Sequence, residues 1–428
     1  MQNHPADQEP RRVLGSFFAP KSQNTPTWEQ RKLGEIAVFS KGVGYSKNDL
    51  CEEGTPIILY GRLYTKYETC IFDVDTFVKE KAGSVYSKGG EVIVPASGET
   101  AEDISIASVV VKPGILLGGD LNIVSPTAEY DSAFLALTIS SGATHKYLSS
   151  LAQGKSVVHL HNSDIQSVSA KFPTKREQEK IHLIFGKIDT LITLHQRKYE
   201  KLVNIKKSML DKMFPQNGAS VPEIRFKGFT DPWEQRKLAE LTKTITTGKS
   251  VNSDEGEVSD GDIGVLKTSC VSYDRFNSSE SKPVVKSEQQ LVKCAVEKDS
   301  VIVSRMNTPE RVGACGYVST DFPNLFLPDR LWKLKFQDTV DTYFVYMMLV
   351  SSAYKEKITS MASGTSGSMY NIPKETFLNL QLVIPAKIDE QKQLGKILKK
   401  IDTLITLHQR KLEKLQNIKK SCLEKMFV

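Results

Sequence analysis

The segment IDTLITLHQRK occurs at residues 188–198 and again at 401–411. The offset of 213 residues is almost half of the 428-residue chain. The match extends to residues 188–214 and 401–427, which differ only at positions 199, 203, 209 and 211 of the first copy. A second match, WEQRKL, lies at 28–33 and 233–238. The chain is therefore a tandem duplication, whose first half runs to about residue 215 and whose second begins near residue 220.

The repeated segment has the pattern of a long helix. Its apolar residues recur at alternating steps of three and four, which is typical of a coiled-coil seam. Each helix is expected to begin after Pro173 or Pro385 and to run for about 40 residues, or about 60 Å. Two such helices in one chain predict an intramolecular antiparallel pair. The expected seam residues are Ile181, Ile184, Ile188, Leu191, His195, Leu202 and Ile205, and in the second copy Leu394, Ile397, Ile401, Leu404, His408, Leu415 and Ile418.

Two histidines, His195 and His408, fall in the middle of this expected seam, close to Lys198 and Lys411. Polar residues at seam positions fix the register of a helix pair at a cost in stability. A register device or a solvated neighbour of the seam is therefore the favoured interpretation, and a metal site or a pH switch is the alternative.

The sequence before each helix predicts a mixed α/β globule. Short β-branched segments bounded by turn residues, such as those at 90–97, 104–111, 262–269 and 300–307, are typical of strands. Asp231 followed by proline, with Glu234 three residues on, predicts a helix start. The expected fold is mixed α/β (α+β). It has two globular domains in a tandem pseudo-twofold repeat, each followed by a long helix, and the two helices pack as an antiparallel coiled coil.

Domain boundaries follow from these patterns. We expect an N-terminal tail at 1–26, a first globule at 27–172, a first helix at 173–215, a linker at 216–232, a second globule at 233–384 and a second helix at 385–428. The helices are nearly identical, whereas the globules differ in sequence, so the two globules are expected to do different things on one symmetric frame.

Charge is concentrated on the helices. Segments 174–214 and 387–428 carry +5 and +6 of a net charge of +7, so the rest of the chain carries −4. A polyanionic partner is plausible, and the basic balance lies on the helices. The six scattered cysteines contain no CxxC pair and indicate neither a zinc site nor a disulfide framework. With no apolar run of 18 residues and no signal-peptide pattern, we expect no membrane association and a cytoplasmic location.

Catalytic motifs are absent from the sequence. GKS at 154–156 and 248–250 lacks the preceding glycine of a phosphate-binding loop. Dinucleotide, zinc-hydrolase, nucleophile-elbow and amino-methyltransferase motifs are also missing. PDRLWKL at 328–334 begins like a nuclease site, but a single aspartate is weak support for one. The sequence therefore predicts a protein that binds rather than catalyses, with no catalytic residue and no metal ligand.

Several motifs resemble one known family. They are WEQRKLGEI at 28–36, VPEIRFKGFTDPWEQRKL at 221–238, SGTSGSMYNIPKETFLNLQLVIPAKIDEQKQLGKIL at 363–398, and the Glu-Gln pairs at 177–178 and 390–391 that follow a proline. Together with the repeated IDTLITLHQRK, they resemble the specificity (S) subunit of type I DNA restriction–modification enzymes. The chain departs from this pattern at residues 1–26, which lack a VPEIRF-like lead, and at 152–165, which match 363–372 only loosely.

The resemblance implies a function. Each globule would be a target-recognition domain for one half of a split, asymmetric double-stranded DNA target, and the helices would set the distance between the half-sites. They would also dock two modification (methyltransferase) subunits and, through them, restriction (endonuclease/translocase) subunits. The chain itself would be non-catalytic and bind no cofactor, with S-adenosylmethionine, ATP and Mg on the partner subunits. The complex would direct adenine-N6 methylation and restriction.

Candidate DNA-binding residues come from polar, glycine-bearing segments of the globules. Arginine and asparagine suit guanine and adenine edges, and lysine and serine suit phosphates. The candidates are Lys41, Tyr45, Lys47, Arg62, Tyr64, Lys66, Ser97 and Lys155 in the first globule, and Lys249, Lys267, Arg305, Asn307, Arg311, Thr365, Ser366 and Asn371 in the second.

Two other functions stay open from the residues alone. One is a coiled-coil adaptor whose two α/β heads bind proteins, and it predicts no salt-dependent DNA affinity. The other is a stand-alone DNA-binding regulator, which predicts tight DNA binding without a methyltransferase.

Overall fold

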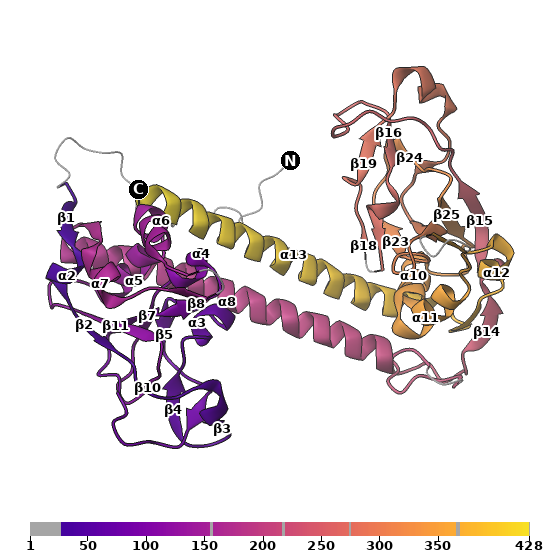
Figure 1. The fold of residues 1–428 in the computed structure, drawn as a ribbon. Helices are drawn as coiled ribbons and strands as arrows, with labels where there is room; N and C mark the ends of the chain where they lie inside the picture. Colours follow the sequence, from indigo (N-terminus) through magenta and orange to yellow (C-terminus); the bar gives the residue numbers. More distant parts are fainter. Residues whose placement is uncertain (1–26, 155–156, 216–218, 274, 365–368, 428) are drawn as a thin grey trace. The chain divides into compact units, whose positions relative to one another are not determined.

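The computed structural model describes residues 27–154, 157–215, 219–273, 275–364 and 369–427 (Figure 1). It divides into two compact units. Unit 1 comprises Met1–His195 with Lys411–Val428, and unit 2 comprises Gln196–Arg410. Each unit therefore contains one globule, one half of the first long helix and one half of the second. The expected tail at 1–26 lies outside the described residues.

Two sheets form the first globule. The larger has the order β2-β11-β7-β9-β5 and is antiparallel except for the parallel pair β5–β9. The smaller has the order β10-β4-β6-β3. The bounds of the strands in these sheets are β2 Ala37–Lys41, β3 Leu50–Cys51, β4 Thr55–Ile58, β5 Cys70–Ile71, β6 Phe77–Val78, β7 Glu91–Pro95, β9 Ser108–Val110, β10 Leu116–Leu117 and β11 Leu121–Pro126. Two further pairs join β1 (Glu29–Lys32) to β13 (Ser169–Phe172) and β8 (Ser97–Gly98) to β12 (Val158–His159).

Helix α5 packs against the large sheet and forms the centre of this globule. Every residue from Ala133 to Ile139 is buried, as expected of a helix that is apolar on all sides. The bounds of the helices are α2 Leu33–Ile36, α3 Arg62–Thr65, α4 Ala101–Ile104, α5 Ser132–Ile139, α6 Gly142–Leu151, α7 Asn162–Ser167 and α8 Lys175–Lys212, with a 3₁₀ helix at Lys47–Asp49.

The second globule also contains two main sheets, with the orders β15-β25-β21-β23 and β19-β16-β24-β20. The strand bounds are β15 Thr242–Thr247, β16 Gly264–Leu266, β19 Ser281–Pro283, β20 Ala295–Val296, β21 Ser300–Ser304, β23 Cys315–Val318, β24 Phe322–Phe326 and β25 Leu331–Phe336. Three short pairs join β14 (Glu234–Lys237) to β27 (Gln381–Ile384), β17 (Val271–Ser272) to β18 (Arg275–Phe276), and β22 (Met306–Asn307) to β26 (Tyr370–Asn371).

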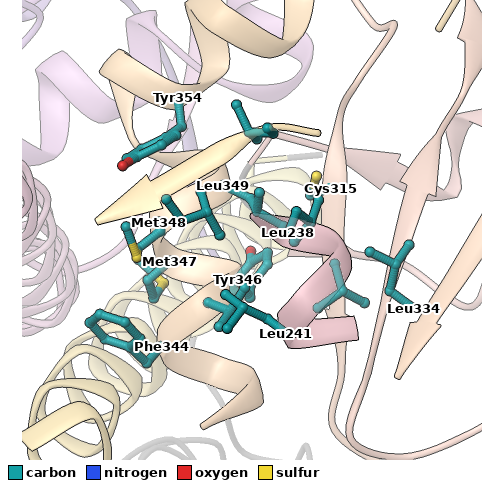
Figure 2. Packing of buried hydrophobic residues seen from close by; sticks show 14 of the residues in the cluster. Leu238, Leu241, Cys315, Leu334, Phe344, Tyr346, Met347, Met348, Leu349 and Tyr354 are labelled. Carbon is teal, nitrogen blue, oxygen red and sulfur yellow. The ribbon is translucent and has the colours of Figure 1, made fainter. Parts of the chain in front are cut away.

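The core of the second globule is built around α10, which corresponds to α5. Figure 2 shows Leu238 and Leu241 of α9 packed with side chains of α10 such as Tyr346 and Met347. The helix bounds are α9 Leu238–Leu241, α10 Thr342–Val350, α11 Ser352–Ser360, α12 Lys374–Leu378 and α13 Ile388–Met426, with 3₁₀ helices at Thr268–Cys270 and Lys286–Leu291. Both globules thus place a terminal strand pair, a main sheet and a buried helix in the same chain order, although their sequences differ. The predicted mixed α/β fold with tandem globules is confirmed.

The two long helices are antiparallel within each unit. In unit 1 Lys419 of α13 pairs with Asp189 of α8 at 2.6 Å, and in unit 2 Lys206 of α8 pairs with Asp402 of α13 at 2.7 Å. The two pairs occupy equivalent positions of the repeat. The globules attach to the same aspartates, because Thr69 donates to Asp189 and Tyr343 donates to Asp402.

Most of the expected seam residues lie on the packed side of the helices, and three do not. Ile181, Ile188, Leu394, Ile401 and Leu415 are buried, and Ile184, His195, Leu202, Ile397, His408 and Ile418 are half-buried. Leu191, Ile205 and Leu404 are instead exposed by 43%, 39% and 42%. After Ile188 the next inward residue is Ile192, four positions on, so Leu191 is turned about 100° away from the packed face.

Each globular core is completed by the end of a long helix. In unit 1 Phe427, just beyond α13, packs against Trp28 and Phe134 with ring centroids at 6.3 and 5.4 Å. In unit 2 Phe214, just beyond α8, packs against Trp233 and Phe344 at 6.2 and 5.6 Å. The repeated Lys-Met-Phe therefore ends each helix with an aromatic residue that is buried in a globule.

The predicted helix start at Asp231 is wrong. Residues 231–233 are not helical, and Glu234–Lys237 form strand β14, paired with β27. Asp231 instead pairs with Lys387 at 2.9 Å. The antiparallel pairing with Gln381–Ile384 satisfies the backbone of this segment and overrides its local helix-start pattern.

Candidate functional site

Each globule carries a short two-stranded ribbon where its central strand leaves the main sheet. In the first globule β7 continues into β8, which pairs with β12, and in the second β21 continues into β22, which pairs with β26. Leu160 N–H donates to the carbonyl of Ala96 at 3.1 Å, and Ile372 N–H donates to that of Arg305 at 2.9 Å. Residues 158–160 and 370–372, which belong to the loosely matching segments, therefore pair in the same way.

Tyr64, Ser97 and His159 meet at the first ribbon. The Tyr64 hydroxyl donates to the backbone carbonyl of Ser97 at 2.6 Å, and Ser97 Oγ lies 3.3 Å from His159 Nδ1. Burial raises the pKa of Tyr64, with a smaller contribution from nearby Tyr60, so the hydroxyl stays protonated and able to donate. Asp120 adopts φ +57° beside the ribbon, and its carbonyl accepts from Ala96 N–H at 2.8 Å.

Arg305 and Asn371 meet at the second ribbon. Arg305 Nε donates to the carbonyl of Asp329 at 2.8 Å, and its Nη1 lies 3.4 Å from Asn371 Oδ1. Ser250 Oγ donates to Asp329 Oδ1 at 2.5 Å and fixes that turn. The carbonyl of Arg330 accepts from Arg305 N–H at 3.1 Å.

The two ribbons have the same backbone pairing but carry side chains of different charge. Ala96 and Arg305 occupy the same position, and the residues whose carbonyls bind their N–H groups are Asp120 and Arg330. Both of these last two are exposed. One globule thus presents an acid where the other presents two arginines, and the ribbons are suited to different ligands.

Three predicted DNA-binding residues are used inside the globules. Tyr45 is 6% exposed and contacts Ser84 Oγ at 2.6 Å. Arg62, 9% exposed, pairs with Asp75 and Glu68 at 2.7 and 2.8 Å. Asn307 is 7% exposed and donates to Ser304 Oγ at 3.0 Å. Their polar groups are bound inside the protein, so these residues hold loops in place, and a contact with DNA stays a prediction for all three.

The remaining candidates divide into four groups. Tyr64 and Ser97, and likewise Arg305 and Asn371, are brought together at the ribbons. Lys66 pairs with Asp75 at 2.9 Å and Lys267 with Glu280 at 3.9 Å, both at the surface. Exposed residues elsewhere are Lys41, Lys47, Lys249 and Arg311. Lys155, Thr365 and Ser366 lie outside the described residues.

Sequence reasoning missed His159, Asp120, Asp329 and Arg330. The last two belong to PDRLWKL, which drew attention only as a weak nuclease-like motif. Asp329 instead orients Arg305 through its carbonyl and is itself held by Ser250. The sequence feature that could have indicated this role is the Pro-Asp pair, which is typical of a turn before a strand. The carboxylate of Asp329 did not indicate it.

Neither a metal centre nor a membrane-spanning helix is found among the described residues. The part of the chain that the structure describes contains no group of three or more His, Cys, Asp and Glu side chains arranged to hold a metal ion. No helix in the same ranges is both long enough and apolar enough to cross a membrane.

Comparison with known proteins identifies the family. The family described as "Type I restriction modification DNA specificity domain" matches residues 26–204 and 230–417. These ranges cover both halves of the duplication, including both ribbons. The chain belongs to this family.

Similar proteins support the same assignment over most of the chain. The type I restriction enzyme MjaVIII specificity subunit of Methanocaldococcus jannaschii is 22% identical over 92% of this chain and 90% of its own length. A putative type I restriction enzyme MjaX specificity subunit of the same organism is 24% identical over 72% of this chain and 71% of its own length. The crystal structure of the type I restriction–modification S subunit from M. genitalium covers 96% of this chain and 98% of its own, at 15% identity and a TM-score of 0.67, which shows a common fold. The chain is thus a type I specificity subunit by family and fold.

Proposed function

We propose that this chain reads a bipartite, asymmetric DNA target and is itself non-catalytic. In this proposal each ribbon, with the loop beside it, reads one half-site, and the long helices fix the gap. The observation that carries the proposal is the pair of ribbons, which share one backbone but carry different side chains. Identical readers on a pseudo-twofold frame would favour a palindrome, whereas an Asp120 side and an Arg305–Arg330 side favour unlike half-sites.

Partner docking is the second part of the proposal. The helices carry exposed leucines on faces that their own units leave uncovered: Leu183, Leu191 and Leu194 of α8 and Leu404 and Leu407 of α13, exposed by 55%, 43%, 44%, 42% and 43%. Leu191 and Leu194 correspond to Leu404 and Leu407 across the repeat. Exposed apolar clusters mark sites of protein association. Two equivalent clusters fit two copies of one partner, and we assign them to two methyltransferase subunits.

The chemistry then belongs to the partners. Methyltransferase subunits would bring S-adenosylmethionine for adenine-N6 methylation. Restriction subunits, joined through them, would bring ATP and Mg. This chain would supply the target sequence and no reacting group.

Methylome sequencing tests the proposal. A host that expresses this chain with its methyltransferase should carry N6-methyladenine in both halves of one split motif, and deleting the chain should remove it. Arg305→Ala should weaken base discrimination in one half-site only, since a lost arginine–guanine contact costs about 1–3 kcal/mol of discrimination. Asp120→Ala should change base discrimination in the other half-site, if it changes any. A variant that altered both halves at once would contradict separate readers.

A binding assay separates the alternatives. The complex with methyltransferase should bind the motif with strong salt dependence, because phosphate contacts release counterions. Tight, specific binding by the isolated chain would favour a stand-alone regulator. Absence of any salt-dependent affinity, with or without the methyltransferase, would favour a protein-binding adaptor.

A further inference from the structure

The first ribbon carries two exposed histidines. His159 lies on β12, and His161 follows two residues later in an extended conformation, with φ −98° and ψ 159°. Their ring planes are nearly parallel, at 3°, and the ring centroids are 6.5 Å apart, so both rings lie on one face of the segment. Histidine is the side chain whose charge ordinarily changes between about pH 5 and 8. Because two charged rings at this separation would repel each other, the pair is expected to take up one proton.

Ser97 favours His159 as the place of that proton. Ser97 Oγ lies 3.3 Å from His159 Nδ1. A serine hydroxyl can donate to the nitrogen of a neutral imidazole or accept from the N–H of a charged one, so this contact persists in both protonation states. Ser97 is only 8% exposed, and its backbone carbonyl accepts from the Tyr64 hydroxyl at 2.6 Å. The ring of His159 is therefore held through Nδ1, and Nε2, on the other side of the ring, is the atom that can meet a ligand.

The second ribbon has a permanent cation at the same place. His159 occupies the position that Asn371 occupies in the second ribbon, and Asn371 Oδ1 lies 3.4 Å from Arg305 Nη1. Arg305 stands where the first ribbon has Ala96. A guanidinium remains charged at every pH at which histidine titrates. At this position the first ribbon therefore carries a positive charge only when His159 is protonated.

The surroundings of the first ribbon are acidic. It packs against α4, contacts α3 through Tyr64, leads into α7 and lies beside the turn before β11. The charged and titratable side chains on these elements, apart from the ion-paired Arg62, are Tyr64 of α3, Glu99 after β8, Glu102 and Asp103 of α4, Asp120 before β11 and Asp164 of α7. Burial raises the pKa of Tyr64, so its hydroxyl stays uncharged. A neutral His159 thus leaves this face negative, which opposes DNA, and a charged His159 offsets part of that repulsion.

We propose that the charged imidazole of His159 donates from Nε2 to an acceptor atom of the half-site that unit 1 reads. The acceptor is a phosphate oxygen or the edge of a guanine, since both bind cationic donors. Binding of this half-site then takes up a proton, so the affinity rises as pH falls through the range in which histidine titrates. The half-site read by unit 2 does not share this dependence, because Arg305 stays charged. This inference rests on the proposed reading of DNA by the two ribbons.

Binding of the complex with methyltransferase to a duplex that carries the methylated motif tests the proposal. Fluorescence anisotropy at constant ionic strength should give a Kd at least about tenfold lower at about pH 6 than at about pH 8, since uptake of one proton changes Kd by up to about tenfold per pH unit. His159→Gln should remove this gain and leave the Kd at about pH 8 unchanged. His161→Gln should keep the gain. So should the matched control His145→Gln, because this half-buried histidine of the same unit contacts Ser105 Oγ at 2.9 Å, away from the ribbon.

Two further measurements identify the acceptor. A phosphate contact should steepen the dependence of log Kd on log salt concentration by about 0.9 at the lower pH and leave base discrimination unchanged. A guanine contact should instead raise discrimination at the base pairs of the half-site read by unit 1, again at the lower pH.

The remaining outcomes overturn the proposal. An equal gain in His159→Gln and in the wild type would show that His159 is not the titrating contact, and loss of the gain in His161→Gln or in His145→Gln would assign it to another histidine. Salt-dependent binding of the motif that does not change with pH would overturn the inference and leave the proposed function standing. No binding of the motif at either pH would contradict the proposed function and this inference together.

Discussion

Asp131 and Asp341 do the same structural work in the two units but differ in acidity. Each caps its buried helix, accepting from the N–H of Phe134 or Phe344 at 2.8 Å. The side chain of a glutamine near the start of the long helix, Gln178 or Gln391, accepts a hydrogen bond from the backbone N–H of the aspartate at 2.9 or 3.0 Å. Their surroundings differ at one position of the long helix, which is His182 in α8 and Gly395 in α13.

The pKa shifts of the two aspartates have opposite directions, and His182 beside Asp131 and Asp299 near Asp341 both contribute. Burial raises the pKa of Asp131, but the contact with His182 Nδ1 at 2.8 Å and the Phe134 N–H outweigh it and leave the pKa below its usual value of 3.8. Burial also raises the pKa of Asp341, and the Phe344 N–H does not offset it, so the pKa stays above 3.8. The same capping hydrogen bonds thus coexist with opposite pKa shifts.

We expect the largest loss of stability from substitutions at the ends of the long helices. These substitutions show whether both units depend equally on the helix end that each buries. Phe427→Ala and Phe214→Ala each remove a buried ring from an aromatic cluster. Each should lower the free energy of unfolding of its own unit by about 3–5 kcal/mol. Urea unfolding with a probe in each globule measures this. Equal losses in both units from one substitution would contradict the division into two units.

Arg225→Ala should be the next most damaging change and should act on unit 2. It leaves Glu390 buried without its bidentate partner, which costs about 3 kcal/mol or more. Thermal unfolding of the full chain measures the loss. Lys387→Ala is the matched control, because its pair with Asp231 is more than half exposed and should contribute less than about 1 kcal/mol.

Neutralising the two capping aspartates should affect the two units differently. Asp131→Asn removes the charge that His182 contacts and should cost about 1–2 kcal/mol at neutral pH. Asp341→Asn keeps an oxygen for the Phe344 N–H and removes a poorly solvated charge, so it should be neutral within about 0.5 kcal/mol. Chemical unfolding at pH 7 compares them. A larger loss from Asp341→Asn would reverse the assignment.

The pH dependence should differ in sign between the two aspartates. Because the folded pKa of Asp131 lies below 3.8, its contribution is present above pH 3.8 and is lost as pH falls through the folded pKa. Because the folded pKa of Asp341 lies above 3.8, its ionisation costs stability near neutrality, and that cost disappears as pH falls through the raised pKa toward 3.8. Unfolding of Asp341→Asn between pH 7 and 4 should lack this relative gain, whereas Asp131→Asn should keep it.

The smallest effect is expected at the helix-pair lysines. Lys206→Met and Lys419→Met each remove one of two equivalent ion pairs whose side chains are partly solvated. Each should cost no more than about 1 kcal/mol, with the same loss in both units and less in high salt. Unequal losses would show that Thr69 and Tyr343, which donate to the same two aspartates, change the strength of the two ion pairs differently.

The frame could be predicted from the sequence because it is local and repeated. The long helices, the tandem globules and the strands at 91–95 and 300–304 depend on periodicity within short segments. Asp231 misled because its helix-start pattern competes with a strand that pairs about 150 residues later. The phase error at Leu191 arose because two apolar neighbours, Leu191 and Ile192, satisfy the same periodic pattern, and only packing decides between them.

The candidate site was less predictable, since it depends on contacts between distant segments. Arg62 has the appearance of a free arginine in sequence, but three acceptors within thirteen residues enclose it. His159 and Asn371 become equivalent only once each ribbon pairs. Local composition gave the residue types, and tertiary pairing decided which of them are presented and which are buried.

The burial of Phe427 in the first globule has a consequence for the order of folding. Unit 2 is a continuous stretch of chain, whereas unit 1 needs residues 411–427 to cover a core that begins at Trp28. During synthesis at about 5–20 residues per second, the first globule would wait tens of seconds for the helix end that completes it. The second globule closes earlier, against the usual N-terminal-first sequence. The first globule is therefore the one whose apolar surface stays open longest and is the natural client of a chaperone.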